Sequence, residues 1–194
     1  MRIAVFCGSR GGGRPAYLQA ARDLGAALAR GGHGLVYGGA RVGTMGALAD
    51  AALGAGAAVT GVMPRALVAR EVAHPGLTEF HAVDSMHARK ALMADLADGF
   101  IALPGGYGTF DELFEVLTWA QLGLHAKPVG LLDVEGFFGP LLAALDHGVE
   151  EGFLDPVHRG LLMREAGVEA LLDRVERWQP GPPASKWEGE GLDR

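Results

Sequence analysis

The feature that most constrains this chain is a glycine turn between an apolar run and an acidic, helix-periodic segment. Residues 99–124 read GFIALPGGYGTFDELFEVLTWAQLGL. Phe100–Leu103 has the character of a buried strand, and the helix that follows carries Asp111 and Glu112 in its expected first turn, where the helix dipole favours carboxylates. The apolar residues that recur at helical spacing are Leu113, Val116, Leu117 and Ala120. The stretch therefore predicts strand, tight turn and helix.

The glycines of this turn, Gly105, Gly106 and Gly108, have a physical use. Because they lack Cβ, backbone N–H groups can approach a ligand closely, and free N–H groups at a helix start form an anion site. We expect Thr109 to cap the helix. A phosphate bound here would have Glu112 as a neighbour, so that carboxylate should face another part of the ligand. The alternative is an ordinary glycine-rich turn with no ligand.

The rest of the chain alternates strand-like and helical segments joined by short glycine loops. Expected strands are Arg2–Cys7, Leu35–Tyr37, Ala58–Met63, Leu77–Val83, Phe100–Leu103, Pro128–Leu132 and Leu161–Met163. Expected helices cover 15–30, the segment from the glycine loop 38–46 to about 53, the segment to about 97 that Asp84 or Ser85 caps, the segment from 109 to about 124, 137–151 and 168–177, with 64–75 irregular. Such alternation predicts one α/β, Rossmann-like domain over residues 1–178, with a doubly wound parallel sheet covered by helices on both faces. The Pro- and Gly-rich tail, 179–194, is expected to be disordered.

Charge and cysteine content narrow the setting. The net charge of −6 argues against a nucleic-acid partner, since phosphate backbones need clustered Lys and Arg. No apolar run approaches the roughly 20 residues of a membrane span. A strand-like segment at the very start leaves no room for a signal peptide, and the single Cys7 cannot form an internal disulfide. These observations predict a cytoplasmic protein without a membrane partner.

Common α/β cofactors do not fit the motifs. The second strand ends without the acidic residue of a dinucleotide site, and Gly38–Thr44 lacks the lysine of a phosphate-binding P-loop. The seven histidines form no H-E-x-x-H or other close ligand set, so we expect no metal. Lys90 and Lys127 are the only lysines before the tail, and neither has the context of a pyridoxal phosphate Schiff base. We therefore expect no cofactor.

Arg89 is the strongest cationic candidate. On a helix it shares one face with Met86 and Met93, so a charge would point from an apolar stripe and would need a partner. One interpretation is that Arg89 extends past the methionines into solvent or pairs with any carboxylate. The functional interpretation places it against Glu112 and the ligand, because its helix directly precedes the strand at Phe100–Leu103.

The segment Pro104–Glu112, PGGYGTFDE, resembles the PGGxGTxxE signature of the LOG ("Lonely Guy") family of cytokinin-activating nucleoside 5′-monophosphate phosphoribohydrolases. The resemblance extends over most of the chain, through the segments Phe6–Ser9, Tyr37–Gly39, Met86–Lys90 and Trp119–Gly123. It implies that Arg89 and Glu112 are the catalytic pair and that Glu71, Lys90, the Gly106–Glu112 loop and Thr118 bind the nucleotide. It also implies a homodimer. Members have often been labelled lysine decarboxylases, an activity that the two lysines do not support.

These observations predict hydrolysis of the N-glycosidic bond of a cytokinin riboside 5′-monophosphate, and of AMP, to free base and ribose 5-phosphate. The expected substrate-binding residues are Ser9, Gly38, Gly39, Glu71, Arg89, Lys90, Gly105, Gly106, Tyr107, Gly108, Thr109, Glu112 and Thr118. The loop Arg10–Arg14 is unusually rich in glycine and arginine, which leaves its preference for base or phosphate open. Two alternatives remain: a nucleotide sensor or carrier without turnover, and a nucleotidase that acts on ordinary purine monophosphates.

Overall fold

The computed structural model describes residues 1–68 and 73–180. Its strands are β1 (Arg2–Phe6), β2 (Gly34–Tyr37), β3 (Val59–Pro64), β4 (Glu79–Val83), β5 (Gly99–Ala102), β6 (Val129–Leu132) and β7 (Leu162–Glu165). Its helices are α1 (Pro15–Arg30), α2 (Gly43–Gly54), α3 (Arg65–Val68), α4 (Met86–Leu96), α5 (Tyr107–Gln121), α6 (Gly139–Glu150), α7 (Pro156–Arg159) and α8 (Val168–Glu176), with a 3-10 turn η1 (Val134–Gly136).

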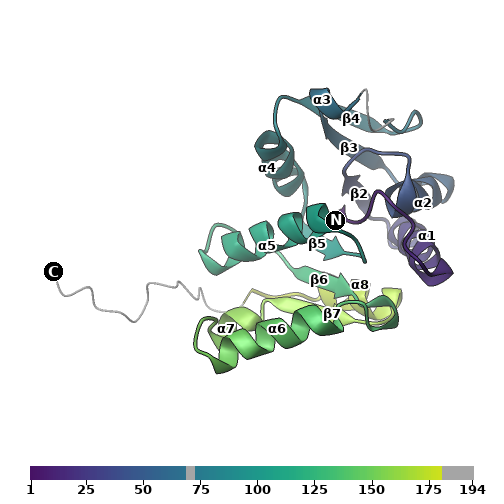
Figure 1. Ribbon diagram of the computed structural model, residues 1–194. Helices are drawn as coiled ribbons and strands as arrows, with labels where there is room; N and C mark the ends of the chain where they lie inside the picture. The colour runs from purple at the N-terminus through teal and green to yellow at the C-terminus, as the bar shows by residue number, and fades with distance from the viewer. Residues whose placement is uncertain (69–72, 181–194) are drawn as a thin grey trace.

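The strands form one parallel sheet of seven in the order β4-β3-β2-β1-β5-β6-β7 (Figure 1). The chain builds outward from β1 on one side, then returns to place β5 on the other side, with Ile3 opposite Gly99. The order of the strands thus reverses between β1 and β5. In open α/β sheets, ligands bind at this switch point, outside the carboxyl ends of the strands.

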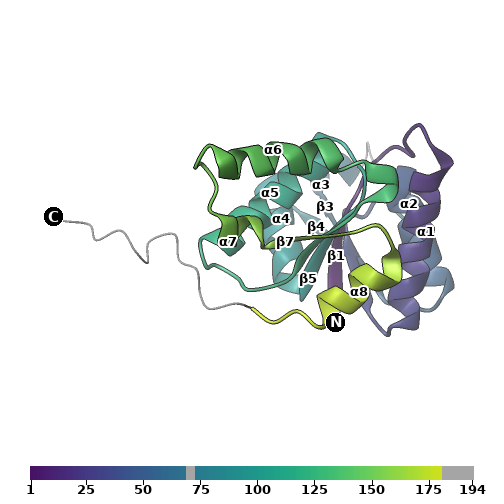
Figure 2. The ribbon, with the colours of Figure 1, turned by 90° about the horizontal axis from the view of Figure 1, so that it is seen from below.

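Helices cover both faces of the sheet, as Figure 2 shows: α1, α2 and α8 lie on one face, and α4, α5 and α6 on the other. Each face has its own apolar core. Leu24, Leu28 and Leu48 belong to the first, and Met93 and Leu113 to the second. Buried on both faces, the central strands consist almost wholly of apolar residues, as a parallel sheet requires. The predicted doubly wound α/β fold is confirmed.

Local boundaries differ from the expectation at several points. Helix α5 begins at Tyr107 with Gly106 as its N-cap, so Asp111 and Glu112 lie in the second turn and not in the first. Within the segment expected to be irregular, 64–75, residues Arg65–Val68 form the short helix α3. Of the two expected caps of α4, Asp84 and Ser85, the structure shows Ser85, whose hydroxyl accepts a hydrogen bond from the N–H of Ala88.

Near the carboxyl-terminal end of the described residues, the indole N–H of Trp178 donates to the carbonyl of Ala126 at 3.0 Å. Most of the predicted disordered tail, residues 181–194, lies outside the described residues. Within the described ranges, no helix combines the length and the apolar character that crossing a membrane requires.

Candidate active site

The start of α5 lies at the carboxyl end of β5, at the switch point. The N–H of Phe110 makes the first helical hydrogen bond, to the carbonyl of Gly106, so the N–H groups of residues 107–109 have no acceptor within the helix. Thr109 is not the helix cap, contrary to the prediction. Its side chain is buried in the first turn and fills the space that a Cβ on Gly105 would need. Position 105 therefore requires glycine.

Arg89 and Glu112 meet at the same edge of the sheet. The guanidinium Nη2 of Arg89, on α4, lies 3.3 Å from Oε1 of Glu112, on α5. Both residues are buried, with 9 % and 7 % of their surface exposed. Arg89 Nη1 also lies 3.8 Å from the sulfur of Met86, one turn back on α4. The interpretation that Arg89 extends into solvent is therefore wrong, and its helix presents the charge to α5.

Burial governs the ionisation of Glu112. Removal from water raises the pKa of its carboxyl group to about 7, and the nearby Arg89 guanidinium opposes that rise. Asp111 raises the pKa further, whereas Lys90 lowers it. Glu112 thus changes its charge near neutral pH, which is the range in which a carboxyl group is most useful for catalysis.

Glycines of the β2 loop bring the backbone close to this pair. A Cβ on Gly38 would overlap the guanidinium of Arg89, so the arginine packs directly on the main chain at the end of β2. Gly39 has φ of +82°, a conformation that other residues rarely adopt. Of the two predicted residues, Gly38 is in direct contact with Arg89, whereas Gly39 packs against Phe80, Gly61 and Met63.

The end of β1 is held by a residue that the sequence analysis did not single out. The hydroxyl of Thr44, at the start of α2, accepts from the N–H of Gly8 at 2.9 Å and donates to its carbonyl at 3.0 Å. Next to Gly8, burial raises the pKa of the Cys7 thiol to about 12. The thiol therefore stays protonated at neutral pH and is not a nucleophile.

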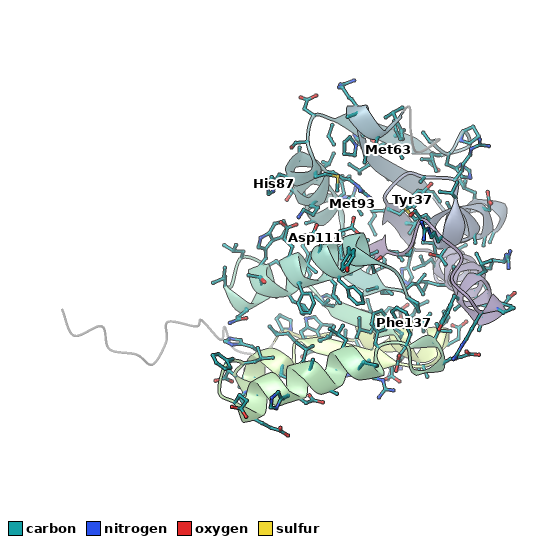
Figure 3. All side chains as sticks on the ribbon, viewed as in Figure 1. Tyr37, Met63, His87, Met93, Asp111 and Phe137 are labelled. Carbon is teal, nitrogen blue, oxygen red and sulfur yellow. The ribbon has the colours of Figure 1, made fainter. Side chains whose placement is uncertain are left out.

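A hollow of about 390 Å³ opens at the switch point, between the loop after β1 (residues 8–12, the β1 loop) and the loop after β5 (residues 104–106, the β5 loop). Its lining residues are Gly8, Ser9, Arg10, Gly11, Gly12, Tyr17, Thr44, Pro104, Gly105, Gly106 and Phe137. Tyr17 and Phe137 are in edge-to-face contact with ring centroids 5.8 Å apart, and Phe137 is labelled in Figure 3. These rings lie 120 positions apart in the chain, and no sequence pattern indicated that they meet.

A larger hollow, about 620 Å³, lies between α1, the end of β6 and the start of α8. Neither Arg89 nor Glu112 lines it, and no glycine loop of β1, β2 or β5 reaches it. Size alone would favour this groove as the ligand site. The convergence of the glycine loops, the buried ion pair and the switch point favours the smaller hollow and the adjoining Arg89–Glu112 pair.

Both described lysines have partners. Lys90 lies 3.0 Å from Asp111 (labelled in Figure 3) and 3.2 Å from Glu115, in a bridge between α4 and α5. Its side chain is 11 % exposed. The amino group of Lys127 donates to the carbonyl of Ala94. Neither lysine is presented as a free amine, which is what a pyridoxal phosphate enzyme requires.

Other predicted site residues are less closely associated with the pair. The Tyr107 side chain is 96 % exposed, so only its backbone faces the turn. Thr118 lies six residues beyond Glu112 on α5, is exposed and donates to the carbonyl of Phe114. Ser9 is exposed at the mouth of the hollow. The predicted residue Glu71 lies outside the described residues, which are 1–68 and 73–180.

Two buried polar atoms at this edge have no hydrogen-bond partner: Arg89 Nε and Thr109 Oγ1. Buried polar groups are normally paired, because an unmade hydrogen bond costs about 1–3 kcal/mol. Unpaired donors on α4 and at the start of α5 suit a polar ligand. No group of three or more His, Cys, Asp or Glu side chains suited to a metal ion occurs among the described residues.

Fold and site together define a Rossmann-like α/β protein with a buried arginine–glutamate pair beside glycine loops at the topological switch point. A protein-family model described as "Possible lysine decarboxylase" matches residues 45–175. The chain belongs to the LOG family of cytokinin riboside 5′-monophosphate phosphoribohydrolases. The predicted family is thereby confirmed.

The relatives match at nearly full length. A cytokinin riboside 5′-monophosphate phosphoribohydrolase of Arabidopsis thaliana is 48 % identical over 179 residues, which cover 92 % of this chain and 82 % of the relative. The corresponding protein of Rhodococcoides fascians is 54 % identical over 174 residues, 89 % of this chain and 88 % of the relative. Among solved structures, the molybdenum cofactor carrier protein of Chlamydomonas reinhardtii has a TM-score of 0.69 at 23 % identity, over 91 % of this chain and 96 % of that chain. The last similarity concerns the fold alone.

Proposed function

We propose that this chain hydrolyses the N-glycosidic bond of cytokinin riboside 5′-monophosphates, and of AMP, to free base and ribose 5-phosphate. The observation that carries the proposal is the buried Arg89–Glu112 pair, with orphaned donors beside it, at the switch point of a fold whose relatives are named for this reaction. Membership of the family supports the reaction class, and the geometry supports the choice of residues.

Glu112 is the proposed catalytic carboxylate. Cleavage of an N-glycosidic bond passes through an oxocarbenium-like state, in which positive charge develops on the sugar. A carboxylate next to the anomeric carbon stabilises that charge or activates the attacking water. Because the pKa of Glu112 is raised to about 7, the group is both ionised in part and basic enough to accept a proton at neutral pH.

Arg89 is the proposed partner of Glu112 and of the substrate. Its guanidinium keeps the carboxylate oriented from 3.3 Å, and its unpartnered Nε is a donor left for a ribose hydroxyl or phosphate oxygen. On the other side of the turn, the N–H groups of residues 107–109 and the Thr109 hydroxyl are suited to the phosphoribosyl part. Both ends of a ribose 5-phosphate thus find donors.

A product assay tests the reaction directly. The protein is incubated with AMP, isopentenyladenosine monophosphate, GMP and CMP, and the free bases are separated by chromatography. We expect adenine and isopentenyladenine to be released and cytosine not to be. Binding of the nucleotides without any free base would indicate a sensor or carrier, and equal release from AMP and GMP would indicate a general purine nucleotidase.

The predicted homodimer is part of the proposal. Beyond the site, α5 and the loop after it expose apolar side chains: Phe114 is 39 %, Leu122 42 % and Leu124 69 % exposed. One helix face of an isolated chain leaves these groups in water, and a second copy packed along α5 would cover them. Light scattering coupled to size exclusion should give twice the chain mass of 20.2 kDa. A single-chain mass, or a dimer unchanged by Leu124→Glu, would contradict this arrangement.

The cytoplasmic location and the absence of a nucleic-acid partner stay predictions from charge and cysteine content. An anionic substrate as small as a nucleoside monophosphate is compatible with a net charge of −6. Salt screens charges beyond ~8–10 Å, so only nearby side chains act on the substrate. The local charges at the glycine loops therefore decide substrate binding.

A further inference from the structure

The hollow between the β1 and β5 loops has an unusual charge for this protein. Of its eleven lining residues, Arg10 is the only charged one. Two further hollows among the described residues include carboxylates, Asp23 and Glu169 in one and Asp50 in the other. In a chain with 23 acidic and 17 basic residues, a hollow lined by a cation and no acid is a local reversal of sign.

Arg10 has no ion-pair partner among residues 1–68 and 73–180. Nearby Arg14 differs, because it pairs with Glu135 at 2.6 Å and so ties the first loop to η1. The free guanidinium of Arg10 therefore retains its full capacity for bidentate binding of a phosphate.

Backbone donors surround the same space. The N–H groups of Ser9, Arg10, Gly11 and Gly12 donate to no oxygen of the described chain. Across the hollow, the β5 loop contributes Gly105 and Gly106, which lead into the free N–H groups at the start of α5. Two sets of unpaired donors from loops about 95 residues apart in the chain thus converge with one arginine. Such an arrangement suits a compact dianion.

The hollow lies within reach of the catalytic pair. Cys7, the residue directly after β1, is close enough to Glu112 and Arg89 for both charges to act on its pKa. The next residue, Gly8, lines the hollow, and a Cβ added to it would lie 3.6 Å from the Cα of Gly105. The carboxylate and the hollow therefore both lie near the end of β1.

Resting on the proposed function, we propose that Arg10 and the backbone of Ser9–Gly12 bind the 5′-phosphate of the nucleotide together with the β5 loop. The sugar then lies at Glu112 and the phosphate in the hollow. Tyr17 and Phe137, whose rings are in edge-to-face contact, line the same hollow. Arg10 is thus a substrate-binding residue of this chain and takes no part in bond cleavage.

The test compares Arg10→Ala with Arg22→Ala. Arg22 is a matched control because it is also exposed and unpaired within the described residues, but it lies on α1 outside this hollow. With AMP as substrate, Arg10→Ala should raise KM about tenfold and leave kcat within about twofold, since a charge-assisted contact to phosphate is lost. Arg22→Ala should change neither, and Arg10→Lys should recover part of the loss.

A readout independent of turnover uses inorganic phosphate as the probe, measured by isothermal titration calorimetry. Wild type and Arg22→Ala should bind it, and Arg10→Ala should bind it about tenfold more weakly. Equal phosphate affinity in all three proteins, or a fall in kcat at unchanged KM, would overturn the assignment of Arg10. If the wild type binds phosphate through Arg10 but releases no base, the proposed function fails and the phosphate site stands.

Discussion

Replacing Glu112 with glutamine should lower kcat for release of adenine from AMP by about 10²–10⁴, the usual cost of removing a catalytic acid–base group. The amide keeps the size of the side chain, which is buried with only 7 % of its surface exposed. It cannot carry the negative charge that stabilises the developing cation of the sugar. Affinity for AMP, measured by calorimetry, should stay measurable, because the phosphate donors at residues 105–109 remain in place.

The pH dependence provides the matching control. Since ionised Glu112 is the active form and its pKa is raised to about 7, wild-type kcat should rise with pH up to about 7 and then level off. The glutamine variant should lose this limb. The free energy of unfolding should change in the opposite direction. The folded chain binds the proton of Glu112 more tightly than the unfolded chain does, because the pKa is raised on folding. The stabilisation from this proton is therefore fully present below about pH 4.5 and is lost as the pH rises through about 7. Full activity of Glu112→Gln would discard the assignment.

Replacing Arg89 with alanine should lower kcat by about 10²–10³, a loss comparable to removal of a preorganised electrostatic group. Arg89 and Lys90 are the two groups that lower the pKa of Glu112. Without the Arg89 guanidinium, only Lys90 opposes the effect of burial, so this pKa rises further. The rising limb of the pH profile should therefore move to higher pH. The free energy of unfolding, measured by thermal denaturation, should fall by about 1–3 kcal/mol. The loss is no larger because Glu112 can take up a proton when its partner is gone.

Arg89→Lys separates the charge from the shape of the side chain. A lysine ammonium supplies the positive charge but not the planar fork that faces Glu112 and leaves Nε for the substrate. We expect it to restore the pH profile more fully than kcat. A kcat for Arg89→Ala equal to that of the wild type would reduce Arg89 to a structural residue.

Much of the fold was predictable because each segment carried its own signal. Apolar runs such as Ile3–Phe6 and Val129–Leu132 were too short for helices. The pairing of Arg89 with Glu112 was also predictable, since a charge on the methionine face of α4 needed a partner and α5 follows the next strand. Helix boundaries were less certain: Gly106 caps α5 with no side-chain hydrogen bond, so sequence favoured Thr109.

The walls of the hollow could not be predicted. Tyr17 and Phe137 meet only because α1 and η1 both lie beside the carboxyl ends of β1 and β6, and a single aromatic residue in a helix or loop gives no sign of its distant neighbour. Thr44 had an ordinary helix-start context, and its two hydrogen bonds to Gly8 depend on the relative placement of β1 and α2. Tertiary packing supplies these contacts, and local sequence does not encode them.

The reversal of strand order between β1 and β5 has a consequence for how the chain acquires activity. The pairing of these strands connects positions such as Ile3 and Gly99, 96 residues apart, so a long chain closure precedes it. Contacts of such high sequence separation are slow to form. The early half of the sheet, β1 to β4, can gather by shorter crossovers, whereas the donors and charges of the two loops come together only after β5 inserts at its centre. Refolding chains should therefore regain helical signal before they regain any enzymatic rate.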